Sequence, residues 1–143
     1  GGTHPSPNYE IICTGKSGHA EVVQIQFDKN VITYEELLKI FWISHDPTTL
    51  NQQGADIGTQ YRSAIFYHDE NQKKIAKDLK KSLNDSKIFG SDIVTEIVEF
   101  KKFYKAEEYH QDYFNKNPNV PYCSYVIKPK LKKFLSEYKN LNQ

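Results

Sequence analysis

The residue best placed to do chemistry is Glu21, at the start of a segment in which apolar and polar residues alternate. Residues 21–27 read EVVQIQF, and Val23, Ile25 and Phe27 recur with the period of a β-strand. Glu21 shares their parity, so a strand here places its carboxyl group on the inward face. Burial raises the pKa of a carboxyl group, and a carboxyl group protonated near neutral pH can act as a general acid. The alternative is that the strand twists at its first residue and Glu21 points into solvent.

A second candidate cluster lies in the run GADIGTQYRSA, residues 54–64. Asp56 stands between two glycines, whose conformational freedom lets a loop aim the carboxylate inward. Tyr61 begins a predicted strand, where a buried ring can leave its hydroxyl group free to reach a ligand. Arg62 could pair with a carboxylate or present its fork to a substrate anion. The alternative is a turn aspartate, a core tyrosine and a surface arginine.

The two cysteines, Cys13 and Cys123, form neither a disulfide framework nor a paired zinc knuckle. Cys13 follows Ile11 and Ile12, so we expect a buried or partly buried structural thiol. Cys123 follows a proline-containing loop, which suits a thiol that must move to meet another thiol, although a buried structural cysteine is the commoner case.

The histidines do not predict a metal site. His19, His45, Asp46 and His110 lack the short, repeated spacing of zinc ligands, and the sequence has no HExxH or CxxC motif. We therefore expect no bound metal.

Composition gives no reason to expect nucleic acid or a membrane as partner. The 19 Lys and Arg side chains nearly balance the 18 Asp and Glu side chains. The lysines at positions 128, 130, 132 and 133 alternate with an apolar helical stripe, which indicates a solvated helix face. No apolar run approaches the roughly 20 residues that span a bilayer.

The elements that must position these residues alternate between strand and helix. Strands are predicted over 21–27, 61–67 and 93–100, with a short strand at 124–127. Helices are predicted from Thr33, with Glu36 completing a capping box, from Asp69, over 106–116 and from Pro129. A polar loop fills 46–60. This order predicts an α/β or α+β fold in a single domain covering residues 1–143.

Three blocks of sequence resemble the methionine sulfoxide reductases of the A type. CTGKSGHAEVVQIQFD resembles the family segment with Cys-Ser-Gly followed by Gly-His-Ala-Glu and a strand. FWISHDPTTLNQQGADIGTQYRSAIF resembles the stretch from Phe-Trp-x-x-His-Asp-Pro through Gly-Thr-Gln-Tyr-Arg-Ser, and FYKAEEYHQDYFNKNP resembles Phe-Tyr-x-Ala-Glu-x-Tyr-His-Gln-x-Tyr. The blocks keep the family's order and spacing over about residues 1–129, and together they are very specific.

The resemblance implies an enzyme that reduces methionine S-sulfoxide, free or in proteins, to methionine. In that family a cysteine thiolate attacks the sulfoxide sulfur and becomes a sulfenic acid. A second thiol then forms a disulfide that thioredoxin reduces, without a bound cofactor. By similarity, Glu21 is the general acid and Cys123 is the candidate resolving thiol. The substrate-binding residues implied by the resemblance are Tyr9, Asp56, Tyr61 and Tyr113.

The sequence departs from the family at its beginning. The family nucleophile lies in a Gly-Cys-Phe-Trp motif well before the tyrosine that Tyr9 matches, and Gly1-Gly2 resembles the end of the family's Gly-Tyr-x-Gly-Gly. We therefore expect the nucleophilic cysteine, the first strand and the first helix to lie outside this sequence, and the chain alone to be inactive. The resemblance otherwise implies a two-layer, ferredoxin-like plait with a mixed sheet, in a cytoplasmic monomer.

Two other functions remain open at this stage. One is a non-catalytic remnant of the fold that binds methionine sulfoxide or a peptide. The other is a hydrolase that uses Glu21 and Asp56 as a carboxylate pair, although no repeat of sugar-binding aromatic residues supports it.

Overall fold

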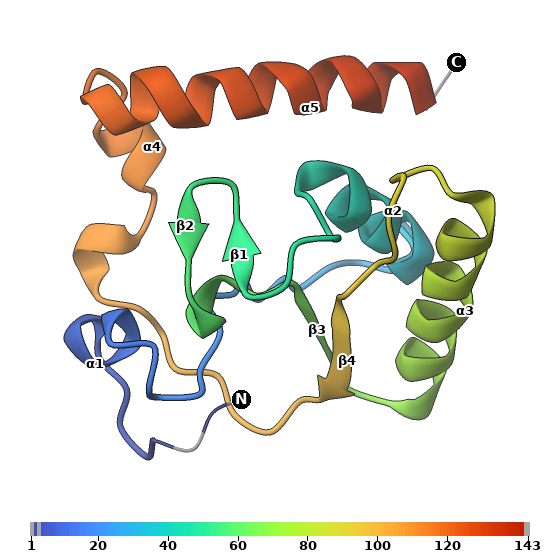
Figure 1. Cartoon of the computed structure of the whole chain (residues 1–143), viewed down its shortest axis with the longest axis horizontal. Helices are drawn as coiled ribbons and strands as arrows, with labels where there is room; N and C mark the ends of the chain where they lie inside the picture. Colours follow the sequence, from blue (N-terminus) through green and yellow to red (C-terminus); the bar gives the residue numbers. More distant parts are fainter. Residues whose placement is uncertain (1, 3, 142–143) are drawn as a thin grey trace. The chain divides into compact units, whose positions relative to one another are not determined.

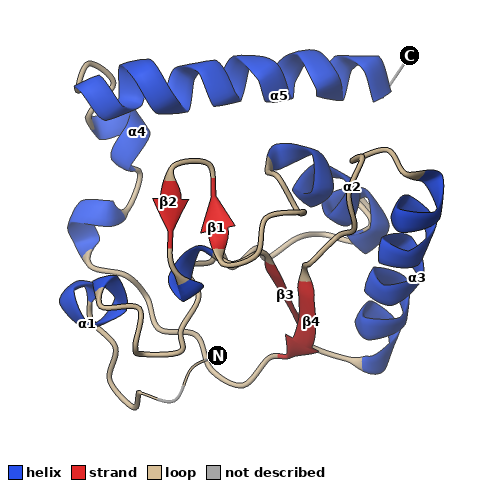
Figure 2. Cartoon of the chain, in the orientation of Figure 1, coloured by secondary structure: helices blue, strands red, loops and turns tan. Residues whose placement is uncertain are grey.

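The chain divides into two compact units, residues 1–104 and residues 105–143. The computed structural model describes residues 2 and 4–141, with side chains up to residue 136. Helices connected by loops and two small sheets make up the chain (Figures 1 and 2), in agreement with the predicted α/β class. The single domain over residues 1–143 and the ferredoxin-like plait stay predictions.

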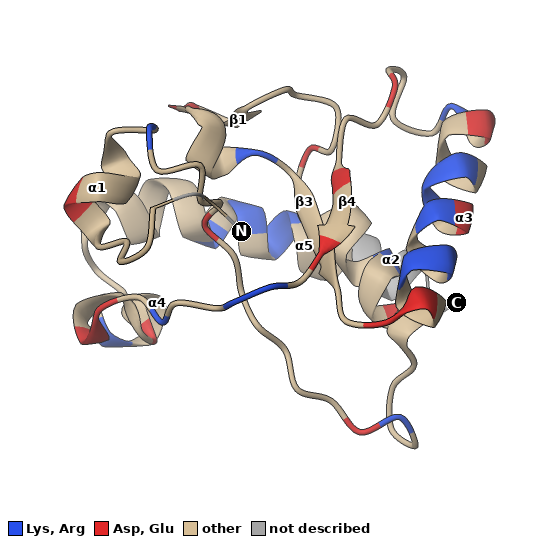
Figure 3. Cartoon of the chain, turned by 90° about the horizontal axis from the view of Figure 1, so that it is seen from below, with Lys and Arg blue, Asp and Glu red and all other residues tan. Residues whose placement is uncertain are grey.

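The centre of the first unit is a β–α–β arrangement. Strands β3 (Ala64–Tyr67) and β4 (Glu96–Glu99) pair in parallel, and helix α3 (Glu70–Ser86) lies between them in the sequence. Parallel strands need such a crossover, because the end of the first strand and the start of the second lie at opposite ends of the sheet. Asp69 caps α3 by accepting a hydrogen bond from the backbone N–H of Gln72, as the sequence predicts. Lysines and acidic residues mark the solvated face of α3 (Figure 3).

Helix α2 (Tyr34–Ser44) begins with the predicted capping box. The Glu36 N–H donates to Thr33 Oγ1 at 3.2 Å, and the Thr33 N–H donates to the Glu36 carboxylate at 2.8 Å. The helix then contributes Leu38 and Trp42 to the core, which α3, β3 and the residues before β4 complete. The buried core residues are Leu38, Trp42, Ile65, Ala76 and Ile93.

The predicted strand over residues 21–27 is wrong as a paired strand. The Glu21 N–H donates to the Gln60 carbonyl at 2.8 Å, but among the described residues no strand pairs with 22–27. Val23 and Ile25 are 82% and 58% exposed instead of inward-facing. Alternation specifies which face of a strand is apolar, whereas strand formation also requires a partner in register, which local sequence does not supply.

Short elements within residues 1–104 lie where no helix or strand is predicted. Helix α1 (Tyr9–Cys13) follows Asn8, whose side chain accepts a hydrogen bond from the Ile11 N–H. Strands β1 (Gln52–Gln53) and β2 (Asp56–Ile57) form a hairpin inside the predicted polar loop. Gly54, at φ 59°, provides the left-handed conformation of its turn.

The unit of residues 105–143 is helical in its described part. The helix predicted over 106–116 is interrupted at Asp112, where φ is 55°, so that a 3₁₀ turn at Glu108–His110 precedes helix α4 (Tyr113–Lys116). The strand predicted at 124–127 is wrong, because Cys123–Ile127 form a π-helical turn that leads into helix α5 (Lys128–Leu141). The start of α5 confirms the helix predicted from Pro129.

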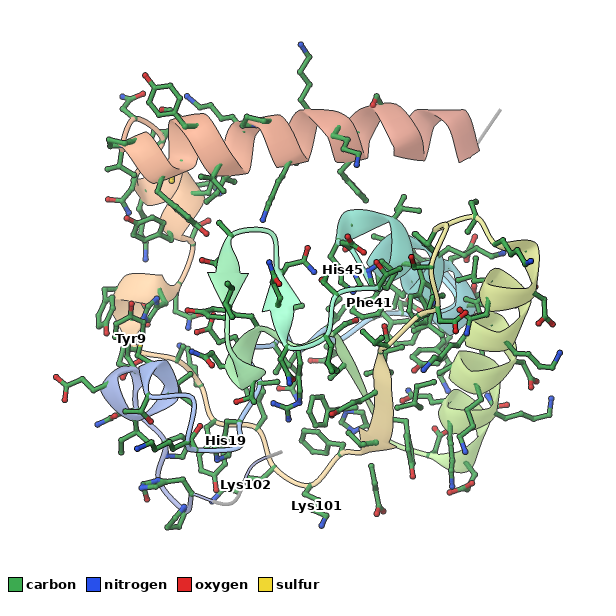
Figure 4. All side chains as sticks on the ribbon, viewed as in Figure 1. Tyr9, His19, Phe41, His45, Lys101 and Lys102 are labelled. Atoms are coloured by element: carbon green, nitrogen blue, oxygen red, sulfur yellow. The ribbon has the colours of Figure 1, made fainter. Side chains whose placement is uncertain are left out.

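A buried polar chain joins α2 to both strands of the parallel pair. His45, which follows α2 beside Phe41 (Figure 4), hydrogen-bonds the Phe41 carbonyl through Nδ1 at 2.7 Å and Ser63 Oγ through Nε2 at 2.7 Å. Ser63 Oγ lies 2.6 Å from Thr95 Oγ1. Because a carbonyl only accepts, Nδ1 carries a proton. In the neutral imidazole Nε2 then accepts from Ser63, and Ser63 in turn accepts from Thr95. Burial lowers the pKa of His45, which favours this neutral form.

We expect the free energy of unfolding to fall as the pH drops below about 6.5. The folded-state pKa of His45 lies below its ordinary value of 6.5, so between the two values the unfolded chain binds a proton that the folded chain does not. The loss is at most ~1.4 kcal/mol per pH unit, and it ends below the folded-state pKa. Urea unfolding at pH 7.5 and pH 5.5 measures it. In His45→Gln the difference between the two pH values should shrink, and an unchanged difference would contradict the assignment.

Candidate active site

The turn before β3 fixes the position of Tyr61. The backbone bends through Gly58, at φ 151°, into a 3₁₀ turn at Thr59–Tyr61. A Cβ atom at position 58 would collide with the side chain of Gln60, which is itself buried. The Gly58 N–H donates to the Asn51 carbonyl at 2.8 Å and so connects the turn to the β1–β2 hairpin that carries Asp56. The two glycines on either side of Asp56 lie at the hairpin turn and at this tight turn.

The loop of residues 15–21 lies against this turn. Thr59 Oγ1 donates to the Gly15 carbonyl at 2.8 Å, and the Glu21 N–H donates to the Gln60 carbonyl at 2.8 Å. A backbone hydrogen bond on Glu21 itself limits where its side chain can reach. The fold therefore holds Glu21 next to the segment that ends in Tyr61.

Electrostatic coupling shows that the predicted site residues of the first unit lie near one another. Burial is the main cause of the raised pKa of Tyr61, and the negative charges of Glu21 and Asp56 add to it. The pKa of Tyr9 is raised mainly by a side-chain hydrogen bond with Cys13, and to a smaller extent by Tyr61 and Glu21. Both phenols are therefore protonated at neutral pH and can donate hydrogen bonds. The structure brings four predicted residues together: Tyr9, Glu21, Asp56 and Tyr61.

Of the two alternatives for Glu21, the structure shows the solvent-exposed one. Residues 22–27, which follow it, pair with no strand in the described part of the chain, so no sheet is built over this side chain. Glu21 and Tyr61 instead line an open groove of about 620 Å³ whose floor includes the apolar side chains of α2. Other residues that line it are Val22, Val23, Ile25, Leu37, Phe41 and Phe66. The groove is large enough to hold an amino-acid side chain beside the carboxyl group.

The two thiols have opposite environments. Cys13 is exposed, so the prediction of a buried or partly buried thiol is wrong: α1 is one short helix that buries none of its residues. Cys123 is fully buried at the start of its π-helical turn. Cys123 and Tyr113 belong to the unit of residues 105–143, and their roles at the site stay predictions.

The histidines make structural contacts. His19 is buried, its Nε2 lies 2.9 Å from the His4 carbonyl, and its ring meets Tyr104 edge-on at 5.3 Å. Within the described part of the chain, no three His, Cys, Asp or Glu side chains are grouped to hold a metal ion. Nor does any helix formed by these residues have the length and apolar character to cross a membrane.

Sequence reasoning missed one feature of the site and left another open. The placement of Cys13 beside Tyr9 follows from their spacing of four on α1, but a five-residue helix gives almost no periodic signal. Arg62 was open between a surface position and a carboxylate partner. The structure resolves this, since its side chain is only 12% exposed and pairs with Glu96 at 3.1 Å.

Comparison with known proteins decides the family. The family model described as peptide methionine sulfoxide reductase matches residues 1–143. The chain belongs to the peptide methionine sulfoxide reductase family. A reductase MsrA of this family from Sulfolobus acidocaldarius is 56% identical over 138 residues, which are 96% of this chain and 77% of the relative. The MsrA from Nautilia profundicola is 55% identical over 143 residues, which are 100% of this chain and 80% of the relative.

Solved structures of the peptide methionine sulfoxide reductase family share the fold. Methionine sulfoxide reductase A of Corynebacterium diphtheriae superposes with a TM-score of 0.79 at 36% identity, covering 87% of this chain and 63% of that one. Reduced Mxr1 from Saccharomyces cerevisiae superposes with a TM-score of 0.77 at 42% identity, covering 85% of this chain and 67% of that one. The resemblance that the three sequence blocks indicate is confirmed.

We expect the two thiols of the 143-residue chain to react at different rates with an aromatic disulfide reagent. Exposed Cys13 should react at once, whereas Cys123 should react only as fast as its surroundings open. Absorbance of the released thiolate measures both phases. Cys13→Ser should remove the fast phase and Cys123→Ser should retain it. A fast phase that survives in Cys13→Ser would contradict the burial of Cys123.

Proposed function

We propose that this chain supplies the proton donor and the hydrogen-bond donors for reduction of methionine S-sulfoxide, free or in proteins, to methionine. Membership of the family supports the reaction class. The observation that supports the assignment to residues is the hydrogen bond from the Glu21 N–H to the Gln60 carbonyl, which holds the backbone of Glu21 next to the turn that ends in Tyr61. The raised pKa of Tyr61, caused by burial and by Glu21 and Asp56, supports a phenol that donates.

The proposed chemistry begins with a cysteine thiolate that attacks the sulfoxide sulfur. As the new S–S bond forms, the S–O bond must break, and an unprotonated oxide is a very poor leaving group. Glu21 donates a proton to this oxygen, while Tyr9 and Tyr61 donate hydrogen bonds to it. The protonated oxygen leaves as hydroxide and attacks the cysteine sulfur, which breaks the new S–S bond, releases methionine and leaves the cysteine as a sulfenic acid. The substrate sulfur is thereby reduced by two electrons and the cysteine sulfur is oxidised by two.

In this proposal Asp56 and Tyr113 complete the polar wall that orients substrate and water. The nucleophile belongs to a Gly-Cys-Phe-Trp segment that these 143 residues do not include. The two-layer plait would place a further strand in the groove beside residues 22–25. The exposed Val23 and Ile25 support this placement, since both line that groove. Such a strand, together with the substrate, would remove water from Glu21 and raise its pKa toward that of a working acid.

The proposed second half of the cycle returns the enzyme to its thiol form. A second thiol condenses with the sulfenic acid, which forms a disulfide and releases water, and thioredoxin reduces that disulfide with two electrons. Cys123 is the proposed resolving thiol, in a cytoplasmic, monomeric enzyme. Because Cys123 is buried, its π-helical turn would have to open first. Direct reduction of the sulfenic acid by an external thiol is the competing route.

We expect Glu21→Gln in the natural gene product to lower kcat for methionine S-sulfoxide by about 10²–10⁴-fold, the usual contribution of a general acid. The amide keeps the shape but has no proton to give, so KM should change little. Steady-state kinetics with free methionine sulfoxide measures both constants. Glu99→Gln, the same substitution at an exposed position on β4, is the matched control. A kcat within about twofold of the wild type in Glu21→Gln would end the acid assignment.

For Cys123→Ser we expect one methionine formed per enzyme and then arrest when thioredoxin is the only reductant, because the sulfenic acid cannot become a disulfide. Rapid-quench measurement of methionine separates the first turnover from the following ones. Cys13→Ser should recycle normally. Sustained turnover with thioredoxin in Cys123→Ser would remove Cys123 from the cycle and favour the external-thiol route.

A further inference from the structure

The side chain of Arg62 connects three separate segments of the first unit. Its Nη2 donates to the Gly18 carbonyl at 3.0 Å, and its Nη1 donates to the Thr59 carbonyl at 2.8 Å. Its Nε donates to the carboxylate of Glu96, the first residue of β4, at 3.1 Å. Gly18 lies three residues before Glu21, and Thr59 lies two residues before Tyr61. One guanidinium group therefore connects the loop that carries the proposed acid to the turn that carries the proposed donor.

The choice of residue at position 62 fits this geometry. Arg62 is the single arginine among the 19 Lys and Arg side chains of the chain. A guanidinium group is planar and presents donors in fixed, divergent directions, whereas an ammonium group is a compact charge on a flexible stem. The side chain is only 12% exposed, so its direction is fixed by surrounding atoms as well as by the pairing with Glu96. A lysine could keep the charge but could not bond both carbonyls and the carboxylate in these directions.

The contacts of Arg62 add to the few hydrogen bonds described between the loop of residues 15–21 and the turn at Thr59–Tyr61. Two other hydrogen bonds join the loop to the turn, from Thr59 Oγ1 to the Gly15 carbonyl and from the Glu21 N–H to the Gln60 carbonyl. Residues 22–27, which follow, have no strand partner among the described residues. Three closely spaced hydrogen bonds, from Thr59, Arg62 and Glu21, thus contribute to the position of Glu21 relative to Tyr61, and Arg62 makes the middle one.

We propose that Arg62 is a positioning residue for the reaction: it holds the loop of Glu21 against the turn of Tyr61, and Glu96 holds Arg62. It does not touch the reacting atoms. This inference rests on the proposed function, in which Glu21 donates the proton and Tyr61 donates a hydrogen bond. Misplacing a catalytic group by about 1 Å can cost 10²-fold in rate. Loosening the connection that Arg62 makes between loop and turn should therefore lower kcat more than it changes KM.

The test uses Arg62→Lys and Glu96→Gln in the natural gene product, with methionine S-sulfoxide as substrate. Arg62→Lys should lower kcat by about 10- to 100-fold with KM within about threefold. Glu96→Gln should lower kcat less, since Arg62 retains both carbonyl contacts. Amide hydrogen exchange at Glu21, followed by NMR, should speed up in Arg62→Lys because the Glu21–Gln60 hydrogen bond opens more often. That exchange readout does not depend on turnover.

Lys80→Gln is the control for general loss of stability. Lys80 donates to the Thr95 carbonyl at 2.8 Å from α3, so its loss weakens the same unit without touching the loop of Glu21. Kinetics are normalised to folded protein by near-UV circular dichroism. An Arg62→Lys protein with unchanged kcat, or with Glu21 exchange no faster than in Lys80→Gln, would overturn the inference. A wild type without activity on methionine S-sulfoxide would instead overturn the proposed function. The exchange rate at Glu21 would still test whether Arg62 holds the loop against the turn.

Discussion

The arrangement of the candidate site depends on hydrogen bonds between a loop and a turn that are about 40 residues apart in the sequence. In most sheets a strand is held by a regular ladder. Here residues 22–27 have no such partner among the described residues, and the neighbouring loop is held through Gly15, Gly18 and Glu21. Each contact contributes only about 1 kcal/mol, so the loop is held in place by several contacts close together and not by any single one.

The β–α–β centre provides the rigid side of that attachment. Core packing of α2 and α3 fixes β3, and the buried chain from His45 through Ser63 to Thr95 fixes the same strand from its polar side. Ser63 follows Arg62 directly, so the backbone of Arg62, which hydrogen-bonds the loop through its side chain, is itself held in place by these contacts of Ser63. Hydrophobic burial and a satisfied polar network thus act on adjacent residues, and the turn that carries the proposed donor Tyr61 is attached to the packed core of the first unit.

Local signals in the sequence predicted α2 and α3 well, because a capping box and an N-cap aspartate act within four residues. The strand at 21–27 failed for the opposite reason: its partner is not a local property. The grouping of Glu21 with Tyr61 followed from the family resemblance. The pairing of Arg62 with Glu96, which is 34 residues away, could not be read from either neighbourhood. Exposure of Cys13 likewise depends on what covers α1.

The exposed run Val22–Phe27 has a consequence for the behaviour of the chain in solution. These six residues are rich in β-branched and amide side chains and contain no charge, proline or glycine. Val23 and Ile25 are exposed to solvent, on a backbone that pairs with no strand of the described chain. Such a segment is a template for cross-β stacking between molecules. Concentrated solutions of these 143 residues should therefore form ordered aggregates without global unfolding. A strand of the same molecule that pairs with this run should prevent the aggregation.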